Sequence, residues 1–173
     1  ILKGNKELIY NDVEFKEIGG VALSQNCNSE LVNGNYFKNI VTNKKDYDDK
    51  AALDLTIATI TLKYTPSNSI SVAYKGQVIG VGAGQQNRVD CIKLAGNKSN
   101  IYHLRKHPKC LKLLQLFKSG IKRQDKVNAV IKYINNDFNN TEYINWLGLF
   151  DTKPEMLEES EKDDFLLKIE NVS

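Results

Sequence analysis

Apolar positions between residues 53 and 64 follow the repeat of an α-helix. Leu53, Ile57, Ile60 and Tyr64 are spaced i, i+4, i+7 and i+11, and a second apolar row runs beside them. Two rows on one cylinder predict a helix that is buried on most sides. The β-branched residues between 56 and 61 also suit a strand, but the two alanines before them favour the helix.

A polar segment follows this helix. Proline disfavours helical geometry in the residue before it, so Pro66 restricts Thr65 to an extended backbone and ends the helix. The next three residues lie between a helix end and a strand start, a place where polar side chains can face a ligand. They are Ser67, Asn68 and Ser69.

Alternating positions then predict strands over residues 69–74 and 77–82, joined by a hairpin turn at Lys75 and Gly76. The second strand runs into a glycine-rich bend, and the helix expected after it offers unpaired amides and a positive dipole end to an anion. The residues of this anion-favouring bend are Gly82, Gly84, Gln85 and Gln86. Gln85 and Gln86 are expected on the start of that helix together with Arg88, which can bind a carboxylate or phosphate at two points.

Spacing alone supports a structural turn and a ligand site equally, because such bends recur on many folds. Three segments say more: S-N-S at 67–69, A-Y-K-G-Q-V-I-G-V-G-A-G-Q-Q-N-R-V at 73–89 and I-K-L-A-G-N-K at 92–98. They closely resemble the transformylase half of the bifunctional AICAR transformylase/IMP cyclohydrolase family. Further similar segments follow the family order, at residues 18–25, 36–42 and 104–108.

The resemblance implies an activity and a fold. Enzymes of that family transfer a formyl group from 10-formyltetrahydrofolate to the 5-amino group of AICAR, and a second domain closes the ring to IMP. The fold implied is mixed α/β, with a cytidine-deaminase-like unit followed by a small helical subdomain. Related zinc deaminases need H-x-E and P-C-x-x-C motifs, which this sequence lacks, so no zinc is expected.

The resemblance also assigns binding roles. It implies that Asn68 contacts AICAR, and an amide can pair with a carboxamide as both donor and acceptor. It implies that Arg88 and Val89 contact the folate, which is anionic and suits an arginine. The family binds a potassium ion at a segment that corresponds to Thr65, Ser67 and Ser69, so the resemblance implies an ion there. Hydroxyls beside a turn, however, more often cap the backbone.

No catalytic residue is expected within the chain itself. In the family the catalytic Lys-His pair lies upstream of the matching segments, and an S-D-A-F-F-P-F loop lies downstream of the position of Ser173. The chain begins at Ile1 without methionine, so we expect an internal fragment that is inactive alone. Family members are homodimers with active sites near the subunit interface, and we expect the cytosol as the location.

Composition narrows the alternatives. The net charge of +3 is too small to argue for nucleic acid, and no apolar run approaches the ~20 residues of a membrane span. Three widely separated cysteines suggest reduced thiols, with neither disulfides nor a metal site. His103 and His107 are spaced as metal ligands on a helix, but surface or capping roles are favoured.

The predicted domains are 1–106, the cytidine-deaminase-like part, and 107–173, the helical subdomain. Within the first, residues 1–13 are read as a linker and 14–25 as a strand containing Gly19 and Gly20, where packing or a bulge is favoured over a ligand. In the second, a basic stretch over 98–132 is followed by an acidic one over 137–170, which suggests that the two pair. Capping boxes are predicted at Thr152 with Glu155 and at Ser160 with Asp163.

Two other functions remain open from the residues alone. One is a binding module that uses the glycine bend for an anion or nucleotide without chemistry. The other is a basic helical module that binds RNA, whose binding would depend steeply on salt.

Overall fold

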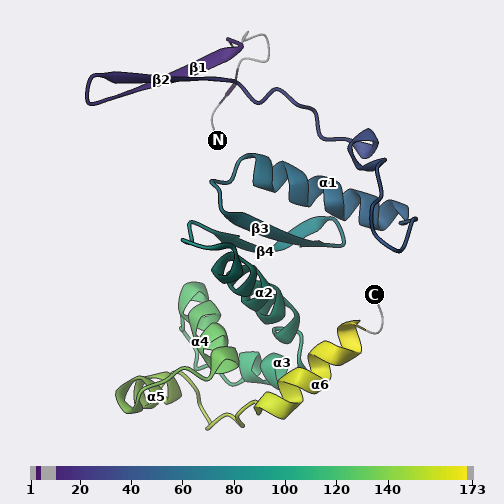
Figure 1. Ribbon diagram of the computed structural model, residues 1–173. Coiled ribbons are helices and arrows are strands. Elements are labelled where there is room, and N and C mark those ends of the chain that lie inside the picture. Colours follow the sequence, from purple (N-terminus) through teal and green to yellow (C-terminus); the bar gives the residue numbers. More distant parts are fainter. Residues whose placement is uncertain (1–2, 5–10, 171–173) are drawn as a thin grey trace. The chain divides into compact units, whose positions relative to one another are not determined.

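The computed structural model describes residues 3–4 and 11–170, and the chain divides into two compact units, residues 1–39 and 40–173. Within the described residues the elements, in chain order, are β1 (Val13–Ile18), β2 (Val21–Asn26), the 3-10 helix η1 (Gly34–Phe37), α1 (Asp49–Lys63), β3 (Ser69–Tyr74), β4 (Gln77–Ala83), α2 (Arg88–Leu104), α3 (Pro108–Gln115), α4 (Arg123–Asn135), α5 (Asn140–Leu147) and α6 (Glu159–Glu170) (Figure 1).

The described part of the first unit is built around the β1–β2 hairpin. The single strand predicted over 14–25 is wrong, because Gly19 and Gly20 form a turn with φ of +59° and +82°. Two consecutive residues with positive φ are what a tight hairpin turn requires, and only glycine adopts that geometry freely. The glycine pair therefore serves neither packing nor a bulge. The linker predicted over 1–13 falls mostly outside the described residues, and its last residue, Val13, begins β1.

Helix α1 confirms the helix predicted from the apolar rows. It begins after Asp48, whose side chain accepts a hydrogen bond from the amide of Ala51, and it ends at Tyr64 before Pro66. Its threonines fit a helix because their hydroxyls donate to carbonyls four residues earlier, as Thr56 does to Ala52 and Thr59 to Leu55.

The expected burial of α1 on most sides is wrong for this chain. None of its residues is fully buried, and a row of large apolar side chains stays exposed to a large extent: Leu53, Leu55, Ile60 and, at the C-cap, Tyr64. A helix with apolar residues on most sides can be surrounded by other elements. Here the described neighbours of α1 cover only the side that faces the sheet.

Strands β3 and β4 form the predicted hairpin. Its turn at Lys75 and Gly76 has φ of 52° and 78°. The carboxylate of Asp54, on α1, accepts hydrogen bonds from both turn amides at 2.9 and 2.6 Å. The turn is thereby fixed to the helix that precedes it.

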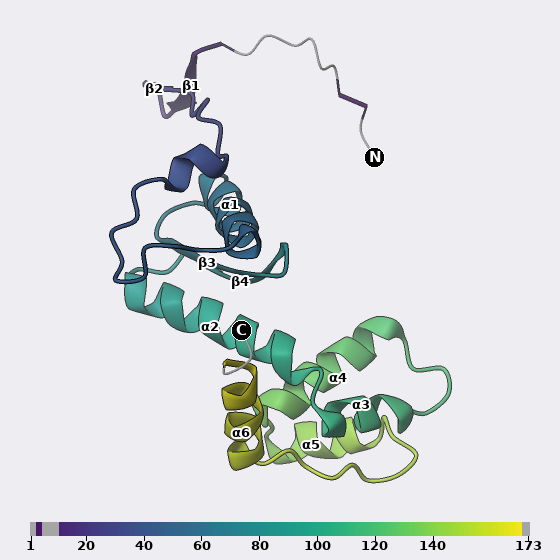
Figure 2. The ribbon, with the colours of Figure 1, turned by 90° about the vertical axis from the view of Figure 1, so that its right-hand side faces the viewer.

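Helices α1 and α2 cover opposite faces of this hairpin (Figures 1 and 2). In the antiparallel register Gly80 pairs with Val72 and Gly82 with Ile70. A Cβ at Gly80 would lie 2.2 Å from the carbonyl oxygen of Ala95, and one at Gly82 would lie 2.0 Å from that of Cys91. The two glycines therefore allow the backbone of α2 to lie directly on β4.

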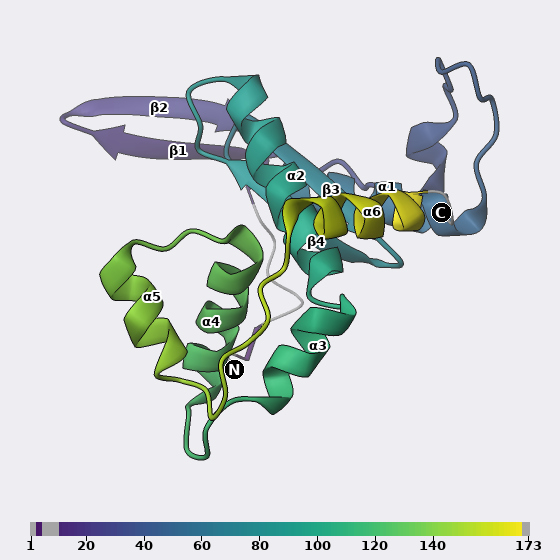
Figure 3. The same cartoon turned by 90° about the horizontal axis from the view of Figure 1, so that it is seen from below.

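The buried core lies mainly in the helical part, around α3, α4 and α5 (Figure 3). Trp146 and Phe150 are buried there, and Tyr133 stacks on Trp146. Their polar atoms are satisfied: the Trp146 indole donates to the carbonyl of Ala129, and the Tyr133 hydroxyl donates to that of Glu155. Tyr133 lies on α4 and Trp146 on α5, so the stacked pair joins these two helices.

Pairing between the basic and acidic stretches is confirmed at two places. Lys109 forms ion pairs with Glu155 at 2.8 Å and Glu161 at 2.7 Å, and Lys132 pairs with Glu142 at 2.8 Å. Hydrogen bonds from Lys109 and from the amide of Glu158 lower the pKa of Glu161 below its usual value.

Neither predicted capping box is found. No helix begins at Thr152, and Ser160 lies inside α6, which begins one residue earlier. The cap is built differently, since the side chain of Glu161 reaches back to the amide of Glu158. A true capping box occurs at Asn139 and Glu142, at the start of α5.

The mixed α/β class expected from the sequence is confirmed by these two hairpins and the helices around them. The described helical core begins with Leu104, at the end of α2. The domain boundary between 106 and 107 stays a prediction, as does the narrower likeness to a cytidine-deaminase unit.

Candidate functional site

The loop before β3 carries the first group of predicted site residues. Thr65 closes α1, and its hydroxyl donates to the carbonyl of Thr61 at 2.6 Å. Asn68 is half-buried immediately before β3, whose first residue, Ser69, pairs with Ala83 at the end of β4. The loop therefore leaves the end of α1 and enters the sheet beside the glycine-rich bend.

The start of α2 carries the second group. Asn87 is its N-cap, with a side chain that accepts from the amide of Asp90 at 2.9 Å and donates to the Asp90 carboxylate at 2.7 Å. Arg88 and Val89 are the first two residues of the helix, and both are exposed. Their amides have no partner among the residues that the structure describes, as is usual at a helix start.

The structure brings these two groups together. The guanidinium of Arg88 donates to the side-chain oxygen of Asn68, with 3.4 Å between Nη2 and Oδ1. Twenty residues separate them in sequence. The contact follows from the fold, because Asn68 precedes β3, Arg88 follows β4, and the two strands are paired at that end.

Two details of the bend differ from the expectation. Gly82 lies within β4 and is occupied by packing against Cys91, so it is not open to an anion. Gln85 and Gln86 precede α2 instead of lying on its first turn, and Gln85 donates back to the carbonyl of Ala83. Gly84 fits the expectation best, since it has φ of +70° and nothing within 4 Å of a Cβ position.

The three hydroxyls predicted to bind potassium lie within one short stretch of the chain, residues 65–69. They are neutral oxygens, which suit a hard monovalent cation. Ser71, on the same strand face as Ser69, has a buried hydroxyl with no hydrogen-bond partner in the described part of the chain. By the chemistry of their oxygens, the residues named for the ion are compatible with it.

The two histidines have structural partners. The His103 ring packs edge-on against Tyr74 and Tyr102, and burial lowers its pKa. His107 caps α3 by accepting a hydrogen bond from the amide of Lys109, as the capping interpretation expects. Over residues 3–4 and 11–170, no three His, Cys, Asp or Glu side chains gather as a metal site would require.

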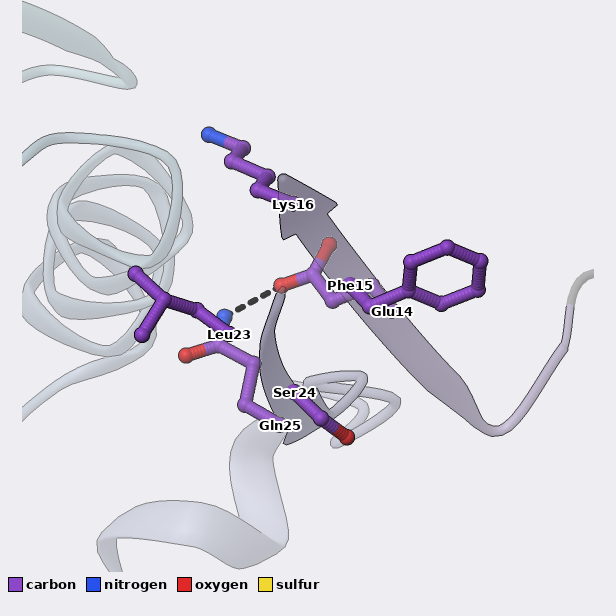
Figure 4. A pocket seen from close by; sticks show the side chains of 6 residues that line it. All are labelled: Glu14, Phe15, Lys16, Leu23, Ser24 and Gln25. Carbon is purple, nitrogen blue, oxygen red and sulfur yellow. Dashed lines mark hydrogen bonds between the residues drawn. The ribbon is translucent and has the colours of Figure 1, made fainter. Parts of the chain in front are cut away.

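A separate cavity of about 200 Å³ lies on the β1–β2 hairpin. Figure 4 shows its lining, with Phe15 and Leu23 directed to opposite sides of the hairpin and Gln25 hydrogen-bonded to Glu14. Every lining residue is exposed, and none of the predicted site residues is among them. We therefore do not assign a function to this cavity.

Sequence reasoning missed Cys91. Its thiol donates to the main-chain carbonyl of Asn68, with 3.0 Å between Sγ and O, and its side chain is fully buried. The sequence identified it only as an isolated cysteine. Its spacing of three from Arg88 places both residues on one side of a helix, which is the signal that was available.

All three cysteines are free thiols, as the sequence predicts. Within the described residues no helix is long and apolar enough to cross a membrane.

Comparisons with known proteins agree with the motifs. Residues 1–98 match the family described as AICARFT/IMPCHase bienzyme. The bifunctional purine biosynthesis protein PurH of Acetivibrio thermocellus is 44% identical over 82 residues, which make up 47% of this chain and 16% of that protein. The protein of the same name from Xylella fastidiosa (strain M12) is 34% identical over 94 residues, or 54% of this chain and 17% of that protein.

The chain thus covers only a small part of the length of these relatives. The matched family segment nevertheless makes up more than half of the chain, and it contains the loop before β3, the glycine bend and the start of α2. The chain therefore belongs to the AICARFT/IMPCHase bienzyme family.

Proposed function

We propose that this chain supplies part of the ligand-binding surface of an AICAR transformylase, the enzyme that moves a formyl group from 10-formyltetrahydrofolate to AICAR in purine biosynthesis. The observation that carries the proposal is the contact between Asn68 and Arg88. It unites, at one end of the β3–β4 hairpin, an amide suited to a carboxamide and a cation suited to an anionic folate.

In this proposal the two side chains position the reactants. Asn68 pairs with the carboxamide of AICAR, while Arg88 and the exposed Val89 contact the folate. The reaction forms a bond between the 5-amino nitrogen of AICAR and the formyl carbon. The bond from that carbon to N10 of the folate breaks, and the amine proton leaves so that tetrahydrofolate is released with a proton on N10. Holding a weakly nucleophilic amine against the formyl carbon is a large part of such catalysis.

The groups that move the proton and stabilise the formyl oxygen are not assigned to this chain. We propose that they come from other parts of a larger protein, which also carries IMP cyclohydrolase activity. The isolated chain is then expected to show no formyl transfer, and a steady-state assay with AICAR and 10-formyltetrahydrofolate checks this. Measurable turnover by the isolated chain would contradict the assignment.

Three further features belong to the proposal. A potassium ion would be held by oxygens of Thr65, Ser67 and Ser69, where it would supply positive charge and fix the loop that carries Asn68. The large apolar side chains exposed on α1 support additional burial in the complete protein, which we propose to be a homodimer. We place that protein in the cytosol.

Arg88→Ala tests the proposal directly. In the complete protein that contains this chain, we expect the dissociation constant of a folate analogue to rise about 10- to 100-fold, because a charge-assisted interaction is lost. Asn68→Ala is expected to weaken AICAR binding by a similar factor. Calorimetric titration at low and moderate salt measures both.

Arg105→Ala is the matched control, because Arg105 is an exposed arginine at the other end of α2. It removes the same charge and should leave folate binding unchanged. Equal effects of the two arginine variants would contradict a specific site. A signal with RNA that falls steeply with salt would instead favour a nucleic-acid module.

A further inference from the structure

We propose that Cys91 is a positioning residue of the candidate site, whose thiol holds the main-chain carbonyl of Asn68 and thereby places the Asn68 amide opposite Arg88. This inference rests on the proposed function, because it assigns a role within the same site. It concerns a fully buried residue to which the proposed function assigns no ligand contact.

Asn68 is held by two hydrogen bonds from α2. Its side-chain oxygen accepts from Arg88 at 3.4 Å, and its main-chain oxygen accepts from the Cys91 thiol at 3.0 Å. Both donors belong to the first turn of α2, three residues apart and on the same side of the helix. The loop that carries the amide is therefore tied to α2 through its backbone as well as its side chain.

The packing beneath the site links this tie to the sheet. The carbonyl oxygen of Cys91 lies against Gly82, where a Cβ would approach it to 2.0 Å. Cys91 thus contacts β4 with its backbone and the loop before β3 with its side chain. Because β3 and β4 are paired at this end, one residue fixes the helix start, the strand and the loop relative to one another.

A plain packing role makes a different prediction. Cys110 is equally buried, within the core of the helical part, where burial raises the pKa of its thiol to about 11. Replacing a buried cysteine by alanine leaves a small void at either position. Only at position 91 does the same change also remove the donor that holds Asn68.

The experiment compares Cys91→Ala, Cys91→Ser and Cys110→Ala in the complete protein that contains this chain. We expect Cys91→Ala to raise the dissociation constant and KM of AICAR about three- to tenfold, as the loss of one weak hydrogen bond implies. The affinity for a folate analogue should change less than twofold. Cys91→Ser keeps a donor and should recover most of the AICAR affinity.

Hydrogen exchange provides a readout that needs no ligand. Cys91→Ala should speed amide exchange at residues 67–69, whereas Cys110→Ala should leave that segment unchanged while lowering the melting temperature. Wild-type AICAR affinity in Cys91→Ala would overturn the inference, as would equal weakening of both ligands in step with lost stability. If the wild-type protein itself binds neither ligand, the proposed function fails and this inference fails with it.

Discussion

Gly82 shows how a single residue can be misjudged when its neighbours in space are unknown. In the sequence it belongs to a glycine-rich bend that is typical of a ligand site. In the structure the backbone of α2 occupies the space that a side chain at this position would need. Gly84, two residues later, keeps the open surroundings that were expected of both. The sequence motif is the same for the two glycines, and only the position of α2 separates their roles.

Gly82→Ala is therefore expected to be strongly destabilising. The new methyl group would meet the carbonyl oxygen of Cys91 at 2.0 Å, and a backbone atom cannot move aside as a side chain does. We expect the free energy of unfolding to fall by about 3 kcal/mol or more, the upper range for overpacking. Urea denaturation measures this change.

Gly96→Ala is the matched control, because nothing lies within 4 Å of its Cβ position on α2. Alanine is the better helix former, so this variant should gain about 0.5–1 kcal/mol. If both alanine variants changed stability alike, the close packing of β4 on α2 would be refuted.

Glu161 gives a residue-scale prediction that depends on pH. Its carboxylate accepts from Lys109 at 2.7 Å and from the amide of Glu158 at 2.9 Å, and both bonds lower its pKa in the folded state. A lowered pKa contributes stability above the unfolded-state value of about 4.3, and this contribution is lost as the pH falls through the folded-state pKa. Glu161→Gln should therefore be less stable than wild type at pH 7, and the difference should shrink at pH 3.5.

Denaturant titrations at the two pH values measure this difference. Asp164→Asn, an exposed carboxylate of the same helix, is the control and should show little change at either pH. A difference between Glu161→Gln and wild type that stays constant from pH 7 to 3.5 would argue against the Lys109 pair.

At the scale of elements, the sequence predicted those features whose causes are local. The apolar period and Pro66 were enough for α1, and Lys75 with Gly76 was enough for the β3–β4 turn. Asn68 and Arg88 were also named as site residues, although their contact was not predicted; it follows once two strands are paired beside a helix start. These features depend on residues close in sequence or on a simple antiparallel register.

Other elements could not be predicted because distant contacts decide them. Thr152 and Glu155 have the spacing of a capping box, but Glu155 instead pairs with Lys109, which is 46 positions earlier in the numbering, and no helix forms there. The exposed side of α1 was missed for the same reason. The apolar period shows which residues share a side of the helix, but it does not show which other elements cover that side. The role of Cys91 required the position of the loop before β3.

For the whole molecule, burial is distributed very unevenly. The described residues of the β1–β2 hairpin are all exposed, including Phe15 at 74%. Helix α4 alone contributes four buried residues to the helical core. A two-stranded hairpin without a covered face is at best marginally stable in water.

Hydrogen exchange on the isolated chain should reflect this distribution. Amides of α4 are expected to exchange orders of magnitude more slowly than those of β1 and β2, which should approach the rates of an unfolded chain. Mass spectrometry of peptic peptides resolves the two regions. Comparable protection in both would show that the hairpin is covered in solution, contrary to this structure.

The threonines of α1 have a consequence for the character of that helix. Each of Thr56, Thr59 and Thr61 donates its hydroxyl to the carbonyl four residues earlier in its own helix. These three hydroxyls therefore have partners within α1 and need none from a neighbouring element. A partner that covers the exposed apolar side chains of α1 can bury these hydroxyls as well, without leaving any of them unpaired.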